Sequence, residues 1–259
     1  MSRLNIEKEL LEGAIIREPV GDEKGYWVGA PGWCWDELGQ AALEALWAIN
    51  LCGGFNPEFA GETLKHANPH VRSWTVRLLG DEKIVPEATA VALAGLAKRE
   101  PHIEVRGQLA ATAKRLPVGQ ALPIVRALLT HDADAGDIYQ PLMVWWALES
   151  KVAAHPDAVL GLFDDESLWQ TSLVREHVLS RLMRRFTKAG TRADLLASAR
   201  LFEMAPNAES AKIVMAGFEQ SYKGRSMAAL PERLLAAMAR HGGGSLALGL
   251  RRGEAKAID

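Results

Sequence analysis

Apolar and polar positions follow one another along the chain with the period of amphipathic helices, and the same pattern returns at a regular interval. A Val-Arg pair occurs at Val71-Arg72, at Val105-Arg106 and at Val174-Arg175. The first interval is 34 residues and the second is 69, about twice the first. A fixed interval of this size is typical of stacked helical repeats. We therefore expect further units near positions 38, 140 and 209.

Alignment of the units at positions 71, 105, 140, 174 and 209 places one mostly apolar face in every copy. The face consists of the residues four, five and eight places after each anchor, which lie on one side of a helix of 3.6 residues per turn. These residues are Thr75, Val76, Leu79, Leu109, Ala110, Ala113, Val144, Trp145, Leu148, Val178, Leu179, Leu182, Ile213, Val214 and Gly217. Each unit is thus predicted to contain a helix with the same buried stripe.

Pro or Gly stands at nearly every junction, and further helices are predicted between those of the stripe. We expect these first helices of each pair at residues 57–67, 86–98, 118–130, 155–163, 192–204 and 227–241. The predicted fold is all-α, a right-handed α-solenoid of about six HEAT-like helix pairs. The Trp-x-x-Leu-Gly-x-x-Tyr pattern of the tetratricopeptide repeat does not occur, which favours the HEAT class. The predicted organisation is an N-terminal segment (1–36), a solenoid (37–252) and a tail (253–259).

Composition limits the function classes. The chain is 48% hydrophobic and 24% charged, which excludes general disorder, and its formal net charge of −2 argues against a general nucleic-acid binder. No apolar run approaches the roughly 20 residues of a membrane-spanning helix. Cys34 and Cys52 form neither a CxxC nor a CxxCH motif, so covalent c-type haem and a cysteine-rich zinc site are excluded. We expect no cofactor and no metal in this chain.

One column of the aligned units varies in chemistry beside the aliphatic stripe. Three places after each anchor stand Trp74, Gln108, Met143, His177 and Lys212. Such variation is what a recognition surface would have. We expect Trp74, Gln108, His177 and Lys212 to contact a partner on the concave face.

Two groups of neighbouring residues are candidates for function on the predicted helices. Trp145 is predicted to lie in the core, and Trp146, about 100° further round the helix, has two interpretations, core packing or an anchor for a partner. Arg175, Glu176 and His177 are residue types found in catalytic sites, but neighbours on a helix cannot converge on one atom. No catalytic residue is predicted.

Charged runs have both structural and functional interpretations. Arg181, Arg184, Arg185, Lys188 and Arg192 form a basic run, which is interpreted first as a solvated helix face and second as a surface for phosphate. The Arg of each Val-Arg pair is predicted to bond turn carbonyls or acids of the next unit.

Two loops are interpreted in the same way. The acidic segment 131–137 departs from a calcium-binding loop at its Gly and at its twelfth position, so we expect a turn that caps the helix after it. The aromatic, Gly-rich segment 25–35 is expected to be a non-helical cap over the first repeat or a remnant of contact with a preceding domain.

Four segments carry a family resemblance: 41–47, 71–81, 141–149 and 173–179. Over roughly residues 38–250 the chain resembles the HEAT region of the PVC-type haem-binding CxxCH proteins, also called membrane-bound dehydrogenase-like proteins. In that family a β-propeller precedes the HEAT region and a cytochrome c domain follows it.

The resemblance implies a non-catalytic scaffold or docking module whose partners are such adjacent domains. It also implies export, whereas residues 1–9 form no secretory signal as they stand, so a complete chain would be expected in the cytoplasm and an exported one would be a fragment. A second hypothesis is a HEAT-fold DNA-binding protein or a DNA-repair glycosylase, which would need a basic concave groove.

Overall fold

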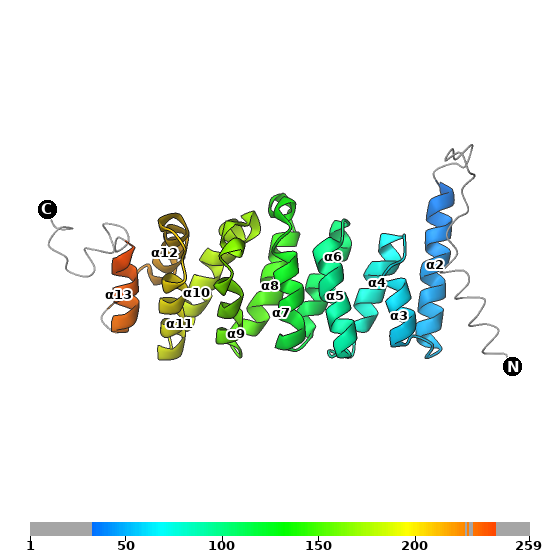
Figure 1. Cartoon of the computed structure of the whole chain (residues 1–259), viewed down its shortest axis with the longest axis horizontal. Helices are drawn as coiled ribbons and strands as arrows, with labels where there is room; N and C mark the ends of the chain where they lie inside the picture. Colours follow the sequence, from blue (N-terminus) through cyan, green and yellow to red (C-terminus); the bar gives the residue numbers. More distant parts are fainter. Residues whose placement is uncertain (1–32, 226, 228–229, 242–259) are drawn as a thin grey trace.

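The protein is all-α in the residues that its computed structural model describes, which are 33–225, 227 and 230–241. These residues form 12 α-helices and no strand (Figure 1). The helices are α2 (Trp33–Leu51), α3 (Pro57–Thr63), α4 (Pro69–Leu79), α5 (Glu87–Arg99), α6 (Ile103–Arg115), α7 (Val118–Leu128), α8 (Gln140–Val152), α9 (Pro156–Gly161), α10 (Leu179–Ala189), α11 (Arg192–Glu203), α12 (Ala208–Tyr222) and α13 (Glu232–Arg240). The 3₁₀ segments are η1 (Asp132–Gly136), η2 (Leu162–Asp164) and η3 (Glu166–Gln170), and η4 (Val174–Val178) is a π-helix.

The helices pack sequentially in two layers. In one layer α4 contacts α6, α6 contacts α8, and α10 contacts α12. In the other layer α5 contacts α7, α9 contacts α11, and α11 contacts α13. The result is an elongated row of helices that runs along the long axis of the molecule (Figure 1). This arrangement is consistent with a helical repeat, as the spacing of the Val-Arg pairs predicts.

Local signals in the sequence explain where several helices begin. The side chains of Asn56, Asn68, Thr191 and Asn207 accept hydrogen bonds from backbone N–H groups in the first turns of α3, α4, α11 and α12. A polar side chain at this position satisfies a donor that has no partner within the helix. The polar junctions between apolar faces therefore start the helices as well as separate them.

Most residues of the stripe predicted from the repeat are buried. Thr75, Leu109, Val144 and Val178, at the fourth position, are at most 1% exposed. Leu79 and Ile213 depart from the prediction, because both are only partly buried. The buried residues of α5 to α13 belong to one continuous core, and a smaller cluster joins α2, α3 and α4.

Gly217 occupies a stripe position at which other copies have Leu or Ala. A Cβ atom there would lie 2.5 Å from the carbonyl oxygen of Ser180, a distance that backbone atoms do not tolerate. The absence of a side chain lets α12 approach α10 closely. Gly217 is therefore explained by close helix packing and not by a turn.

Several expected boundaries need correction. Helix α3 ends at Thr63, four residues before the predicted end at 67, and α13 begins at Glu232 rather than at 227. The predicted helix 155–163 is α9 followed by the 3₁₀ segment η2. Helix α2 begins at Trp33, so the end of the segment expected to be non-helical is helical. Segments 1–32 and 242–259, which hold the rest of the predicted cap and the tail, lie outside the described residues.

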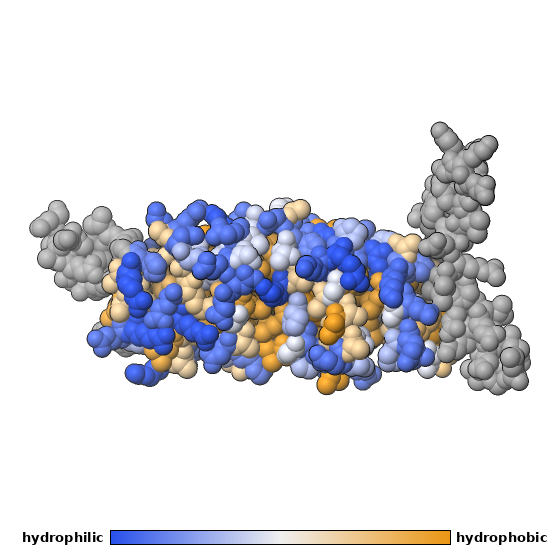
Figure 2. Space-filling model, in the orientation of Figure 1, coloured by the Kyte–Doolittle hydropathy of each residue, from blue (hydrophilic) through white to orange (hydrophobic). Residues whose placement is uncertain are grey.

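The Val-Arg pair at 174–175 is also a local exception. Segment η4 winds as a π-helix, whereas the equivalent residues in α4 and α6 are α-helical. A π-helix places one more residue in a turn, yet Leu179 and Leu182 after it are fully buried, as the stripe predicts. Figure 2 shows hydrophilic side chains over much of the visible face toward α10–α13, with hydrophobic ones between helices nearer the middle.

Candidate functional site

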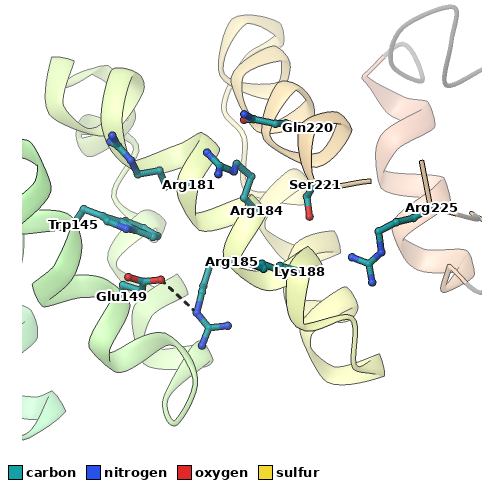
Figure 3. A pocket seen from close by; sticks show the side chains of 9 residues that line it. All are labelled: Trp145, Glu149, Arg181, Arg184, Arg185, Lys188, Gln220, Ser221 and Arg225. Atoms are coloured by element: carbon teal, nitrogen blue, oxygen red, sulfur yellow. Dashed lines mark ion pairs between the residues drawn. The ribbon is translucent and has the colours of Figure 1, made fainter. Parts of the chain in front are cut away.

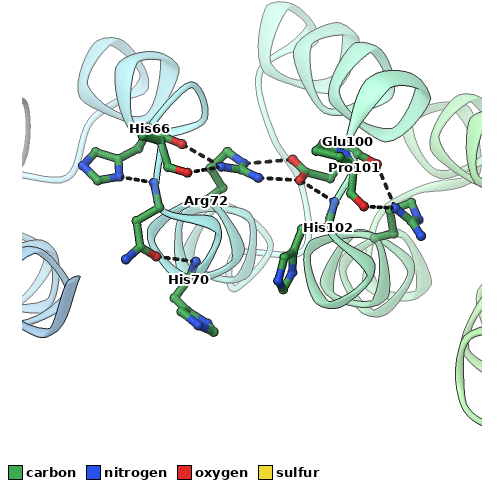
Figure 4. A network of polar contacts seen from close by, with 9 residues as sticks. His66, His70, Arg72, Glu100, Pro101 and His102 are labelled. Atoms are coloured by element: carbon green, nitrogen blue, oxygen red, sulfur yellow. Dashed lines mark hydrogen bonds and ion pairs between the residues drawn. The ribbon is translucent and has the colours of Figure 1, made fainter. Parts of the chain in front are cut away.

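The repeated Val-Arg position holds a largely buried arginine between successive helix pairs. Arg72 donates from Nε to Glu100 at 2.9 Å and from Nη2 to the other oxygen of Glu100 at 2.5 Å (Figure 4). Its Nη1 donates to the carbonyl oxygens of His66 and Ala67, both at 2.8 Å. The guanidinium group thus ties the turn before α4 to the end of α5 in the next pair.

Arg106 repeats this geometry 34 residues later. Its Nε donates to Asp134 at 2.7 Å, its Nη2 donates to the other oxygen of the same carboxylate, and its Nη1 donates to the carbonyl oxygens of Glu100 and Pro101. We call these two networks, centred on Arg72 and Arg106, the arginine clamps. The prediction that these arginines bond turn carbonyls and acids of the next unit is confirmed. Their donors are used within the fold, which leaves them unsuited to holding phosphate.

Electrostatics favours the charged form of the acid in the first clamp. Burial raises the pKa of Glu100, but hydrogen bonds from Arg72 and from the backbone N–H of His102, together with the charge of Arg72, lower it by more. The net pKa therefore lies below the usual value of a glutamate. The clamp is an ion pair at neutral pH.

The acidic segment 131–137 is structural in the same sense. Asp134 is the partner of Arg106, and Asp132 accepts a hydrogen bond from the backbone N–H of Ser172 at 2.6 Å. Asp137 accepts from the N–H groups at the start of α8, at 2.8 Å, and these bonds lower its pKa. The expected capping turn is confirmed, although α8 begins at Gln140.

Two of the predicted partner-binding residues share a cavity. Gln108 and Trp146 line a hollow of about 550 Å³ between α4, α6 and α8, together with Met143, Arg77 and Lys114. Trp146 is 48% exposed, and the Nζ atom of Lys114 lies 5.8 Å from the centre of its ring. The interpretation of Trp146 as a surface aromatic residue is thus the one the structure favours.

Trp74 lies at the edge of this region. Its ring meets that of Trp47 edge to face, with centroids 4.9 Å apart, and Arg77 lies over it at 5.4 Å. Trp74 is partly buried against the cluster of α2, α3 and α4. It contributes to packing as well as to the surface next to the hollow.

His177 and Lys212 lie apart from that hollow. The Nε2 atom of His177 is 3.0 Å from the carbonyl oxygen of Ala135, a hydrogen bond that ties η4 to the acidic turn. Lys212 is exposed on α12. Arg175, two residues before His177, pairs with Glu209. The structure therefore brings together only part of the predicted column.

A second and larger cavity lies over α8, α10 and α12. Its volume is about 760 Å³, and we call it the basic cleft (Figure 3). Its lining residues are Trp145, Glu149, Arg181, Arg184, Arg185, Lys188, Gln220, Ser221 and Arg225. Five of these side chains are cationic and one is a carboxylate.

The amphipathic pattern of α10 explains how the cleft forms. Leu179, Leu182, Met183 and Phe186 are fully buried on the inner side of this helix. The four basic residues from 181 to 188 fall between them, at spacings of three, four and seven, and so share the outer side. The helix that anchors the C-terminal half of the core thereby presents a row of cations to the surface.

The cations of the cleft are only partly neutralised. Arg185 lies 3.6 Å from Glu149, Arg181 donates to the carbonyl oxygen of His177 at 2.7 Å, and Arg225 donates to that of Thr187 at 3.1 Å. Within the described part of the chain, Arg184 and Lys188 have no ion pair.

Burial and a neighbouring charge both act on the pKa of Arg181. Burial, followed by the charge of Arg184, lowers its pKa below the usual value of an arginine. With five cations and one carboxylate among its lining residues, the cleft carries a net positive charge.

The basic run in the sequence predicts part of this site. The basic run contains four of the lining residues, but Arg192 does not line the cleft and Arg225 was not singled out. Arg225 comes from the segment after α12, 40 residues beyond Arg185, and no local spacing connects it with α10. Its position follows from the stacking of α12 on α10.

Comparison with protein families, with curated proteins and with solved structures found no match to this chain. No helix of the described residues is long and apolar enough to cross a lipid bilayer. No cluster of three or more potential metal ligands occurs within residues 33–225, 227 and 230–241.

Proposed function

We propose that this chain is a non-catalytic, HEAT-type scaffold or docking module, a right-handed solenoid of about six helix pairs. We propose further that it corresponds to the HEAT region of the PVC-type haem-binding proteins, which it resembles in sequence. On this proposal it holds no cofactor of its own and binds adjacent domains of the β-propeller or cytochrome c type.

The observation that carries the proposal is the pair of arginine clamps. Arg72 and Arg106 each join their own helix pair to the next one through bidentate contacts to buried carboxylates. A bidentate ion pair fixes both distance and orientation, so the units are held in one relative arrangement. This supports a role as a stiff frame that presents a long surface at constant geometry.

Trp146 is the residue on which we place the docking contact. An aromatic side chain that is half exposed beside a hollow can bury a large apolar area in a partner, as residues that dominate binding energy do. The hollow it lines, with Gln108 and Lys114, offers polar groups around that anchor.

The test uses separately expressed propeller and cytochrome c domains of a protein of the resembled family. Either domain is expected to bind the immobilised chain, and Trp146→Ala is expected to weaken the complex by about 30-fold, the effect of losing roughly 2 kcal/mol at an anchor. Tyr139→Ala is the matched control, because Tyr139 is 72% exposed and lines neither cavity. Both variants should have the same melting temperature as the wild type.

Two results would contradict the proposal. The first is no complex with either domain, and the second is equal loss of binding in Trp146→Ala and Tyr139→Ala. A Soret absorption band in the purified chain would contradict the expected absence of a haem. Tight binding to duplex DNA at physiological salt would favour the DNA-binding hypothesis instead.

A further inference from the structure

We infer that the basic cleft over α8, α10 and α12 receives an acidic segment of a protein partner. This inference rests on the proposed docking function and adds the chemistry of what docks. It concerns a surface separate from the hollow that Trp146 lines.

The basic cleft differs in charge from the rest of the described surface. Several arginines elsewhere are paired with carboxylates, as in Arg115–Asp81, Arg200–Asp157 and Arg233–Glu203. In the cleft, five cations share one carboxylate, Glu149. A protein with a net charge of −2 thus concentrates unneutralised positive charge in one concave place. Such a place attracts a complementary anion.

The cations of the basic cleft are spread along and around α10. Arg181 and Lys188 are seven residues apart on α10, which separates their backbones by about 10 Å. The side chains of Arg184 and Arg185 leave the helix in different directions, and Arg225 approaches from beyond α12 (Figure 3). Charges that fan out in this way suit several carboxylates spaced along a chain better than one phosphate group, which needs converging donors.

The arrangement of the cations suits a protein segment better than nucleic acid. Nucleic-acid binding draws on a track of cations that contacts many phosphates. The hollow between α4, α6 and α8 also holds cations, but Arg115 pairs with Asp81, and Arg77 and Lys114 lie over the rings of Trp74 and Trp146. The cations of the cleft therefore form one group rather than a row that continues into that hollow. The indole of Trp145 adds an apolar wall to the cleft. Cationic groups beside an apolar wall match a peptide that carries both carboxylates and carbon-rich side chains.

Arg184 and Lys188 are the residues best placed to make the contact. Both are exposed, and within the described residues neither forms an ion pair. They therefore need not break an existing pair in order to bind a carboxylate.

The experiment measures binding of a fluorescein-labelled hexaglutamate peptide to the whole chain at low ionic strength, by fluorescence anisotropy. Arg184→Gln/Lys188→Gln is expected to weaken binding by about tenfold, since two charge pairs are lost. Lys98→Gln/Arg99→Gln is the matched control, because it removes the same two residue types from exposed positions at the end of α5. The control is expected to change the affinity by less than about twofold.

Several outcomes would overturn the inference. These are equal loss in both double variants, tighter binding of a single-stranded oligonucleotide of the same charge, and displacement of the peptide by inorganic phosphate at matched ionic strength. If the partner domains bind in a way that depends on Trp146 but the peptide does not bind, only this inference is wrong and the docking function is unaffected. Absence of any domain complex would instead remove the docking function.

Discussion

The arginine clamps and the basic cleft use the same residue type for different ends. Arg72 and Arg106 each find a carboxylate 28 residues later, in the next helix pair, and become part of the core. Arg184 projects from a helix of the same layer, yet no described carboxylate reaches it. The difference lies in the partner and not in the arginine, and it decides whether the cation stabilises the stack or remains available at the surface.

Burial sets the energetic contrast between the two regions. The side chains of Arg106 and Asp134 are 9% and 2% exposed. Removing one member of such a pair leaves an uncompensated charge away from water, which costs several kcal/mol. Cations on an open cleft keep their water, so removing them changes stability little.

The largest effect is expected on the inner side of α10. Leu182→Asp should unfold the chain, because an unpaired buried carboxylate costs several kcal/mol against a total stability of about 5–15 kcal/mol. Lys188→Asp, on the outer side of the same helix, should leave the chain folded. Far-ultraviolet circular dichroism on melting compares the two. Equal melting would show that the register of α10 is wrong.

Leu79 sharpens that comparison. The repeat predicts that Leu79 is buried as deeply as Leu182, but Leu79 is only partly buried. Leu79→Asp is therefore expected to lower the melting temperature without abolishing folding. Complete unfolding of this variant would mean that the end of α4 packs more tightly than the structure indicates.

The second effect separates a clamp from a surface ion pair. Asp134→Ala should lower the free energy of unfolding by about 3–5 kcal/mol, because Arg106 is left buried without its partner. Asp157→Ala removes the partner of Arg200, at a carboxylate that is 90% exposed, and should cost about 1 kcal/mol or less. Urea unfolding measures both. Similar losses would remove the distinction between clamps and surface pairs.

The third effect is the response of the first clamp to acid. The folded pKa of Glu100 lies below its unfolded value, so its contribution to stability is complete above about pH 4.5 and is lost as the pH falls through the folded pKa. The stability difference between wild type and Glu100→Gln should therefore narrow from about pH 7 to about pH 3. Glu166→Gln, at an exposed side chain, serves as the control. A difference that is constant with pH would contradict the charged clamp.

The layers and the buried stripe could be predicted because they depend on local periodicity. Helix positions four, five and eight after each anchor lie on one helix face, and in most copies, as at Leu109 and Val144, that face is buried. The clamp arginines were also predictable in kind, since a repeated Arg after a turn has carbonyls within reach.

The two cavities could not be predicted in the same way. Segment Val174–Val178 winds as a π-helix, and no residue type in that segment predicts it. The contribution of Arg225 depends on how α12 is stacked, which the closeness of Gly217 to Ser180 permits. These features depend on tertiary packing. Residues at the same position of each repeat, such as Gln108 and His177, therefore lie in different surroundings although the repeat predicts one shared surface.

The smallest effect on stability belongs to the basic cleft itself, and its sign is informative. Arg184→Gln/Lys188→Gln should change the free energy of unfolding by no more than about 0.5 kcal/mol, since both side chains are exposed and neither has an ion pair among the described residues. The change should be toward greater stability, because the charge of Arg184 disfavours the charged form of Arg181 and its removal relieves that repulsion.

Added salt screens the same repulsion and should therefore stabilise the wild type more than the variant. Urea unfolding at low and at high salt measures both quantities. A marked loss of stability in the variant, or a gain from salt that is equal in both proteins, would show that these cations are held by the fold as the clamp arginines are, and the contrast between the two regions would fail.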